Sequence, residues 1–145
     1  MIDRVKIEDV PAEETWVRLK DDATSVLIDV RTRAEWTFVG LPDLGTLNKR
    51  VLTVEWQGFP DNRIDPDFVT KLSGLLDGAG VAKDAELFFI CRSGARSRAA
   101  AAAMADVGYS RCRNVEDGFE GPLDAGQRRG QVAGWKSAGL PWRQG

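Results

Sequence analysis

The sequence contains no histidine among its 145 residues. This absence excludes Ser-His-Asp and Cys-His catalysis, acid–base catalysis by imidazole, and nearly all zinc sites. Any nucleophile must therefore be ionised without the help of a histidine base, and cysteine is the side chain that can be ionised in this way near neutral pH. Nothing in the sequence implies a metal or an organic cofactor.

Cysteines are few, and long apolar runs and an excess of positive charge are missing. Cys91 and Cys112 are the only cysteines, and a reducing compartment would keep both as thiols. No apolar run approaches the ~20 residues that span a membrane, and the first residues lack the apolar core of a signal peptide, so we expect a cytoplasmic protein with no membrane partner. The net charge of -2 argues against a nucleic-acid partner.

The length and an ordinary composition, 43% hydrophobic and 29% charged, predict a single domain over residues 1–145. Short apolar and β-branched runs predict strands at residues 5–7, 25–30, 51–54, 87–90 and 111–115. Helical spacing and capping residues predict helices at residues 11–20, 32–38, 66–77 and 95–107, with a short helical piece at 135–138. This alternation predicts an α/β fold, with a mostly parallel five-stranded sheet and helices on both faces.

One run of residues carries the clearest chemical signal, and it lies between the expected strand 87–90 and the alanine-rich helix after it. The run is Cys91, Arg92, Ser93, Gly94, Ala95, Arg96 and Ser97. A cysteine at the end of a buried strand, in a tight loop that opens a helix, is surrounded by backbone N–H groups and by the positive end of the helix dipole. Both features favour the thiolate over the thiol. The sequence therefore predicts an anion-binding cup with Cys91 as the nucleophile at its base.

A second motif ends another expected strand, at Asp29 and Arg31. In parallel sheets, ligands bind beyond the carboxyl ends of the strands. We therefore expect Asp29, Arg31 and Cys91 to meet at one edge of the sheet.

These motifs resemble the rhodanese domain, the fold of the thiosulfate sulfurtransferases. Residues 27–31 (LIDVR), followed by Glu35 and Trp36, are similar to the family's Asp-Val-Arg strand end and its Glu-Trp/Phe helix. Residues 91–97 resemble its active-site loop, and residues 108–121 with 135–141 resemble the end of its domain. Residues 40–45 lack the histidine that the family often has there, and residues 123–134 look inserted. Both departures border the expected pocket and so bear on the substrate.

The resemblance implies a sulfurtransferase that works through a persulfide. Thiolate Cys91 would take the outer sulfur of thiosulfate or of a persulfide donor and then pass it to a thiophilic acceptor. The backbone N–H groups of residues 92–96 would stabilise the persulfide anion. The expected partners are a small anionic sulfur donor, such as thiosulfate, and a thiol acceptor or a protein persulfide.

Roles for the remaining motif residues follow from the resemblance and from residue type. Arg92, Ser93, Gly94 and Ala95 are expected to line the substrate site, and Arg96 either steers the donor or holds the loop through backbone carbonyls. Arg31 faces the donor anion or pairs with Glu35, four residues later. Asp29 and Ser97 are expected to support the loop. The loop around Trp56 and Phe59 is a candidate wall of the pocket, whereas nothing places Cys112 near Cys91.

Two other functions stay open. Cysteine loops of this kind also serve phosphatases and arsenate reductases, but related cell-division phosphatases separate the cysteine and the arginine by five residues. Four residues separate Cys91 from Arg96, which predicts a smaller cup that suits a sulfur atom. The second alternative is a sulfur-carrier or regulatory module that keeps the cysteine without turning over.

Overall fold

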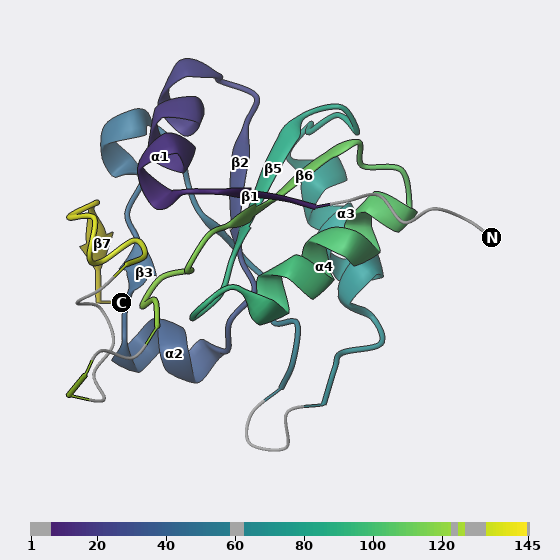
Figure 1. Ribbon diagram of the computed structural model, residues 1–145. Coiled ribbons are helices and arrows are strands. Elements are labelled where there is room, and N and C mark those ends of the chain that lie inside the picture. Colours follow the sequence, from purple (N-terminus) through teal and green to yellow (C-terminus); the bar gives the residue numbers. More distant parts are fainter. Residues whose placement is uncertain (1–6, 59–62, 123–124, 127–132, 145) are drawn as a thin grey trace.

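The computed structural model describes residues 7–58, 63–122, 125–126 and 133–144. The first half of the chain forms β1 (Glu8–Val10), α1 (Ala12–Asp21), β2 (Val26–Asp29), α2 (Arg33–Phe38), β3 (Leu41–Pro42), a 3-10 turn (Gly45–Leu47) and β4 (Leu52–Thr53). The second half forms α3 (Phe68–Gly78), β5 (Glu86–Ile90), α4 (Ala95–Asp106), β6 (Arg111–Val115) and β7 (Trp142–Arg143). Figure 1 shows these elements in place.

Five strands form one parallel sheet in the order β1-β6-β5-β2-β4. The central strand β5 is buried at every position, which is typical of a parallel strand covered on both faces. Its last residue, Ile90, lies beside Asp29 of β2. The short strands β3 and β7 form a separate antiparallel pair at the edge of the molecule. The predicted α/β fold with a mostly parallel five-stranded sheet is confirmed.

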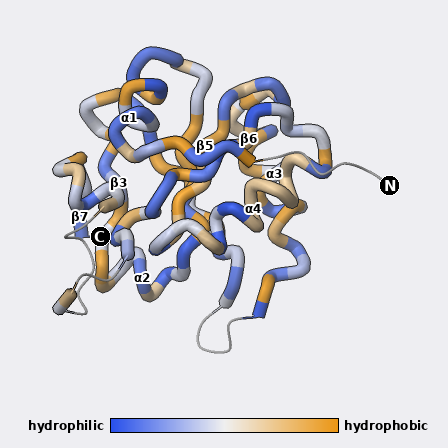
Figure 2. Tube along the Cα trace, in the orientation of Figure 1, coloured by the Kyte–Doolittle hydropathy of each residue, from blue (hydrophilic) through white to orange (hydrophobic). Residues whose placement is uncertain are grey.

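The two faces of the sheet carry two hydrophobic clusters, because successive side chains of β5 point to opposite sides. Leu87 and Phe89 pack with α3 and α4, whereas Phe88 and Ile90 pack with α1 and the C-terminal segment. The alanine-rich helix α4 buries the small side chains of its inner face against the sheet, and Figure 2 shows the pale hydrophobic colour of these alanines. Helices therefore cover both faces, as predicted.

Local elements differ from the prediction in four places. The first strand begins at Glu8 rather than covering residues 5–7, of which 5 and 6 lie outside the described part. The third helix begins at Phe68, after a turn at Asp65. Residues 135–138 form turns rather than a helix, because Gly134 and Gly139 take positive φ angles of 101° and 75°. The pairing of β3 with β7 was not predicted.

No helix in the described part of the chain is both long and apolar enough to cross a membrane.

Candidate active site

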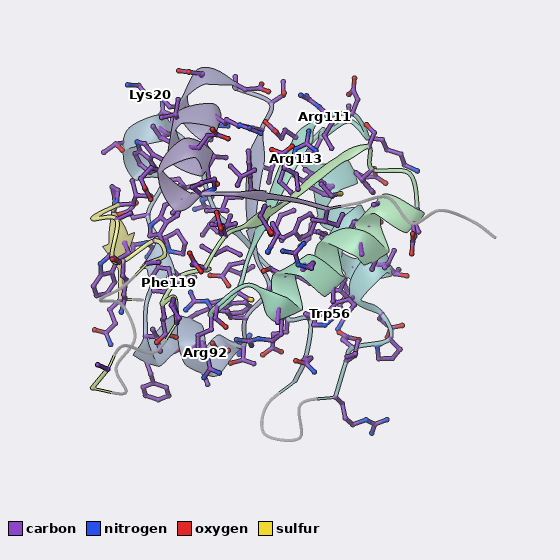
Figure 3. All side chains as sticks on the ribbon, viewed as in Figure 1. Lys20, Trp56, Arg92, Arg111, Arg113 and Phe119 are labelled. Atoms are coloured by element: carbon purple, nitrogen blue, oxygen red, sulfur yellow. The ribbon has the colours of Figure 1, made fainter. Side chains whose placement is uncertain are left out.

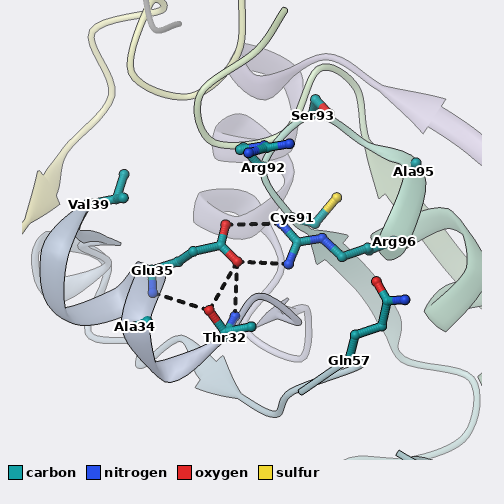
Figure 4. A pocket seen from close by; sticks show the side chains of 10 residues that line it. All are labelled: Thr32, Ala34, Glu35, Val39, Gln57, Cys91, Arg92, Ser93, Ala95 and Arg96. Atoms are coloured by element: carbon teal, nitrogen blue, oxygen red, sulfur yellow. Dashed lines mark hydrogen bonds and ion pairs between the residues drawn. The ribbon is translucent and has the colours of Figure 1, made fainter. Parts of the chain in front are cut away.

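Cys91 follows β5 directly and lies at the carboxyl edge of the sheet. The Val30 N–H donates to the Ile90 carbonyl at 3.0 Å, so the end of β2 lies beside the start of the cysteine loop, as the sequence predicted. Only 1% of Cys91 is exposed. It lies at the base of a cavity of about 640 Å³, which is lined by Thr32, Ala34, Glu35, Val39, Gln57, Cys91, Arg92, Ser93, Ala95 and Arg96 (Figure 4).

Two donors surround the sulfur atom. The Gly94 N–H points to Cys91 Sγ at 3.1 Å, and the Ser97 hydroxyl lies 3.2 Å from the same atom. Gly94 precedes the first residue of α4 with a φ of 116°, a conformation that glycine adopts at little cost. The N-terminus of α4 therefore begins beside the sulfur, where its dipole favours negative charge.

Behind Ser97 lies a residue that the sequence analysis did not single out, Asn114 of β6. The Ser97 hydroxyl lies 2.5 Å from Asn114 Oδ1, and Asn114 Nδ2 donates to Asp9 Oδ1 at 2.9 Å. A hydrogen bond from Arg98 lowers the pKa of Asp9, so this acceptor is ionised at neutral pH. The Asp9 carboxylate therefore holds the Asn114 amide with its carbonyl towards Ser97. The available signal was an asparagine near the end of the predicted strand 111–115, but nothing in the sequence placed that strand beside the cysteine loop.

Arg96 makes a two-pronged ion pair with Glu35 across the cavity (Figure 4). The two bonds measure 2.8 Å to Oε1 and 3.0 Å to Oε2. Burial by itself would raise the pKa of Glu35, but the hydrogen bonds and charge of Arg96 outweigh burial and lower it. The hydrogen bonds that Arg96 donates to Glu35 in turn raise the pKa of Arg96. The sequence analysis named Glu35 but predicted neither this pairing nor its place in the cavity.

Arg31 differs from both of its predicted placements. It neither lines the cavity nor pairs with Glu35; its side chain is fully buried. Its Nε and a terminal nitrogen bind the Asp29 carboxylate at 3.0 and 2.7 Å, and the same terminal nitrogen donates to the Gly40 carbonyl. Arg31 lies two residues beyond the end of β2 at Asp29, and its N–H also donates to the Asp29 carboxylate at 3.1 Å, so the local backbone turn holds Arg31 beside Asp29.

The segment after β6 holds the cysteine loop from behind. The Phe119 N–H donates to the Cys91 carbonyl at 2.8 Å, and Glu120 and Gly121 donate to the Arg92 carbonyl. Gly118 has a φ of 63°, and a Cβ built on it would lie 2.5 Å from the Cys91 carbonyl oxygen, so this approach requires glycine. The Arg31 guanidinium lies 4.3 Å from the centre of the Phe119 ring. Asp29 therefore supports the cysteine loop indirectly: it binds Arg31, Arg31 packs on the Phe119 ring, and the Phe119 N–H binds the Cys91 carbonyl.

The other predicted pocket residues divide into two groups. Arg92 and Ser93 are exposed at the loop and line the cavity together with Ala95. Trp56 packs edge-on against Phe68, 5.0 Å between ring centres, and its neighbour Gln57 lines the cavity instead. Phe59 and most of the apparent insertion at residues 123–134 lie outside the described residues.

Cys112 lies at the opposite end of the sheet from Cys91. It pairs with Leu87, four residues before Cys91 on β5, which separates the two cysteines by roughly 13 Å along the strand. Figure 3 shows its neighbours Arg111 and Arg113 at the far end of the sheet from Arg92. Burial raises the pKa of the Cys112 thiol to about 12. This geometry gives Cys112 no direct contact with the active cysteine.

Comparisons with known proteins cover nearly the whole chain. A family model described as the STR4 middle domain matches residues 8–145. An uncharacterized protein of Rickettsia conorii is 34% identical over 139 residues, which cover 96% of this chain and 99% of that protein. The crystal structure of Rv0390 from M. tuberculosis has a TM-score of 0.85 and 40% sequence identity, and the match covers 97% of this chain and 100% of that one.

Two relatives at lower identity have more informative names. The rhodanese-like domain-containing protein 4, chloroplastic, of Arabidopsis thaliana is 27% identical over 134 residues, which cover 90% of this chain and 24% of that protein. A sulfurtransferase of Allochromatium vinosum is 26% identical over 135 residues, which cover 93% of this chain and 94% of that protein. The first of these names contains the rhodanese-like domain that the motifs at residues 27–36 and 91–97 resemble, and the second names the reaction class that the resemblance implies.

Proposed function

This chain belongs to the STR4 middle domain family and has a rhodanese-like fold, and we propose on that premise that it is a sulfurtransferase. It moves a sulfane sulfur from thiosulfate or a persulfide donor to a thiophilic acceptor through a persulfide on Cys91. The observation that carries the proposal is the pair of donors, the Gly94 N–H and the Ser97 hydroxyl, directed at Cys91 Sγ at the base of the cavity. The sulfurtransferase of Allochromatium vinosum supports the same reaction class.

In the first half-reaction, the Cys91 thiolate attacks the outer sulfur of the donor. A new S–S bond forms at Sγ, and the donor's own S–S bond breaks. Its electron pair leaves with sulfite when the donor is thiosulfate, or with a thiolate when the donor is a persulfide. No proton has to be removed by a base in this step, which fits a chain without histidine.

In the second half-reaction, a thiolate or cyanide attacks the outer sulfur of the Cys91 persulfide. The bond between that sulfur and Sγ breaks, and Cys91 leaves as the thiolate with which the cycle began. The Gly94 N–H, the Ser97 hydroxyl and the start of α4 stabilise negative charge on the cysteine side at both stages. These groups are fixed in place by the loop, so they need no reorganisation during transfer.

A phosphatase is less well supported by the same geometry. A phosphate-binding loop needs an arginine that can bind the phosphate oxygens in a two-pronged manner. Arg96 is the loop arginine in that position, and both of its terminal nitrogens bind Glu35.

Intact mass spectrometry of the reduced protein tests the proposal. Incubation with thiosulfate, and separately with glutathione hydropersulfide, should add one sulfur atom, and cyanide should remove it as thiocyanate. Cys91→Ser should abolish the adduct, whereas Cys112→Ser, the matched control, should keep it. No adduct with either donor contradicts the proposal. A stable adduct that acceptors never discharge favours a sulfur-carrier module instead.

A further inference from the structure

The loop arginine of the cavity is engaged before any substrate arrives. Both terminal nitrogens of Arg96 bind the Glu35 carboxylate, at 2.8 and 3.0 Å. Glu35 is itself held by α2, because its Oε1 accepts from the N–H and the hydroxyl of Thr32 in a capping box. A donor anion that would bind both terminal nitrogens of Arg96 in the same two-pronged way therefore competes with a carboxylate that is fixed at the helix terminus.

The charges that line the cavity cancel. Two arginines, Arg92 and Arg96, line the cavity with the Glu35 carboxylate, and the thiolate that the proposed mechanism uses at Cys91 adds the second negative charge. A dianion such as thiosulfate gains no net attraction from a neutral cup. Thiosulfate brings two negative charges into the cavity beside the Glu35 carboxylate. The reacting end of an organic persulfide brings at most one, because the alkyl group next to its sulfur carries none.

The size and the walls of the cavity also fit an organic group. The volume of about 640 Å³ exceeds what a small inorganic anion fills. Ala34, Val39 and Ala95 supply apolar wall, while Arg92 is exposed at the rim. Figure 4 shows Arg92 on the other side of Cys91 from the bound Arg96–Glu35 pair. A ligand that reaches Cys91 therefore contacts the apolar wall of the cavity. The cation that it can bind is Arg92 at the rim, away from the reacting sulfur.

We infer, resting on the proposed function, that the preferred sulfur donor is a small organic hydropersulfide with a carboxylate on its arm, rather than thiosulfate. The terminal sulfur reaches Cys91, the alkyl arm lies against the apolar wall of the cavity, and the carboxylate binds Arg92 at the rim. Glu35 disfavours thiosulfate by holding Arg96 and by repelling a dianion.

The transfer balances without a further reactant. The Cys91 thiolate forms a bond to the terminal sulfur of R–S–SH, and the S–S bond of the donor breaks. The electron pair of that bond leaves on R–S⁻. The single proton stays with the transferred sulfur, which is then the outer sulfur of the Cys91 hydropersulfide.

Glu35→Gln is the decisive substitution, because glutamine also serves at this position of a capping box and so preserves the start of α2. It removes the negative charge and releases Arg96. We expect kcat/KM for thiosulfate to rise about tenfold, and kcat/KM for glutathione hydropersulfide to change less than about twofold. Glu13→Gln makes the same charge change on the exposed face of α1 and should alter neither value.

Arg92→Gln tests the rim contact with the folded active site otherwise unchanged. It should lower kcat/KM about tenfold for glutathione hydropersulfide, whose arm carries carboxylates, and leave the value for 2-mercaptoethanol hydropersulfide, which has none, within about twofold. An equal fall in kcat/KM with both donors would contradict a contact between Arg92 and the donor carboxylate.

The donor inference and the proposed function fail in different ways. If the wild type uses thiosulfate as well as it uses glutathione hydropersulfide and Glu35→Gln changes neither rate, the donor inference is wrong while sulfur transfer stands. If none of these donors places a cyanide-removable sulfur on Cys91, the proposed function fails and the donor inference fails with it. Circular dichroism of each variant identifies any loss of fold. If Glu35→Gln does not fold, the donor inference is tested by the wild-type ratio of kcat/KM for glutathione hydropersulfide to kcat/KM for thiosulfate, and by Arg92→Gln.

Discussion

The Ser97 hydroxyl lies between Cys91 Sγ at 3.2 Å and Asn114 Oδ1 at 2.5 Å. The Gly94 carbonyl is a third acceptor, 3.2 Å from the same hydroxyl. A hydroxyl has one proton to donate, so the three acceptors compete for it. When Cys91 is a thiolate, the negative sulfur is the strongest acceptor of the three. Ser97 therefore acts on the nucleophile directly, and Asn114 acts through Ser97.

Ser97→Ala should slow the chemistry of Cys91. The thiolate loses a hydroxyl donor, and we expect alkylation by iodoacetamide at neutral pH to fall roughly tenfold, since a hydrogen bond to a charged group is worth ~1.5–3 kcal/mol. Mass spectrometry of the alkylated protein over time measures the rate. Ser110→Ala, at an exposed serine far along β6 from the site, should leave it unchanged. Equal rates in all three proteins would contradict a direct role for Ser97.

Asn114→Leu should lower the stability of the protein without slowing the alkylation of Cys91. It removes an acceptor that competes for the Ser97 proton, so alkylation of Cys91 should not slow. The buried Ser97 loses a partner and the Asp9 carboxylate loses a donor, and we expect the free energy of unfolding to fall by ~1–3 kcal/mol. Urea denaturation measures this loss. Slower alkylation with unchanged stability would show that Asn114 acts on the cysteine in some other way.

Asp29→Asn should be among the most destabilising single changes at the site. The Asp29–Arg31 pair is fully buried, and neutralising one partner leaves an uncompensated guanidinium inside the protein. Breaking buried pairs in this way costs ~3–5 kcal/mol of unfolding free energy. Glu14→Gln, which breaks a half-exposed pair with Arg18 on α1, should cost less than ~1 kcal/mol in the same denaturation experiment. Similar losses for both variants would contradict this account.

The Glu35–Arg96 pair should make stability depend on pH. The pKa of Glu35 is lower in the folded protein than its ordinary value of 4.5. A group with a depressed folded pKa stabilises the protein above its unfolded pKa, and this contribution is lost as the pH falls through the folded pKa. The difference in unfolding free energy between the wild type and Glu35→Gln should therefore be constant near about pH 7 and shrink towards about pH 3. A difference that grows on acidification would reverse the sign and contradict the pairing.

Cys112 should be inert in the folded protein. Because burial raises the pKa of its thiol to about 12, almost no thiolate exists at neutral or mildly alkaline pH. Iodoacetamide near pH 8, close to the ordinary pKa of a free cysteine, should modify Cys91 first and reach Cys112 only after unfolding in urea. Peptide mapping distinguishes the two sites. Rapid modification of native Cys112, or an intramolecular disulfide to Cys91, would contradict the observed placement.

The sequence predicted the parts of the site that depend on elements following one another along the chain. An apolar run followed by the loop from Cys91 to Ser97 and an alanine-rich helix fixes the edge at which the cysteine lies, because parallel strands share that edge. Turns were not predicted at residues 135–138. There the Trp135 Nε1–H donates to the Pro141 carbonyl, six residues later, and the flanking Gly134 and Gly139 take positive φ angles that oppose a helix.

Side-chain partners were harder to predict than backbone elements. Arginine has a long side chain, and several carboxylates lie within its reach. Spacing along the sequence allowed Arg31 to pair with Glu35. Asp29, two residues before Arg31, instead binds both the N–H and the guanidinium of Arg31, which leaves Glu35 for Arg96, 61 residues away. Asn114 could be recognised only once β6 was known to lie beside β5 and its end beside α4.

The depth of Cys91 gives the empty and the loaded protein different outer surfaces. With 1% of its surface exposed, Cys91 is covered by its neighbours, and reagents reach it through the opening of the cavity. In the proposed cycle an attached sulfur extends one S–S bond, about 2 Å, beyond Sγ. The loaded protein therefore presents a sulfur atom nearer the opening of the cavity than the empty protein does. An acceptor can distinguish the two states at the opening without any movement of the polypeptide.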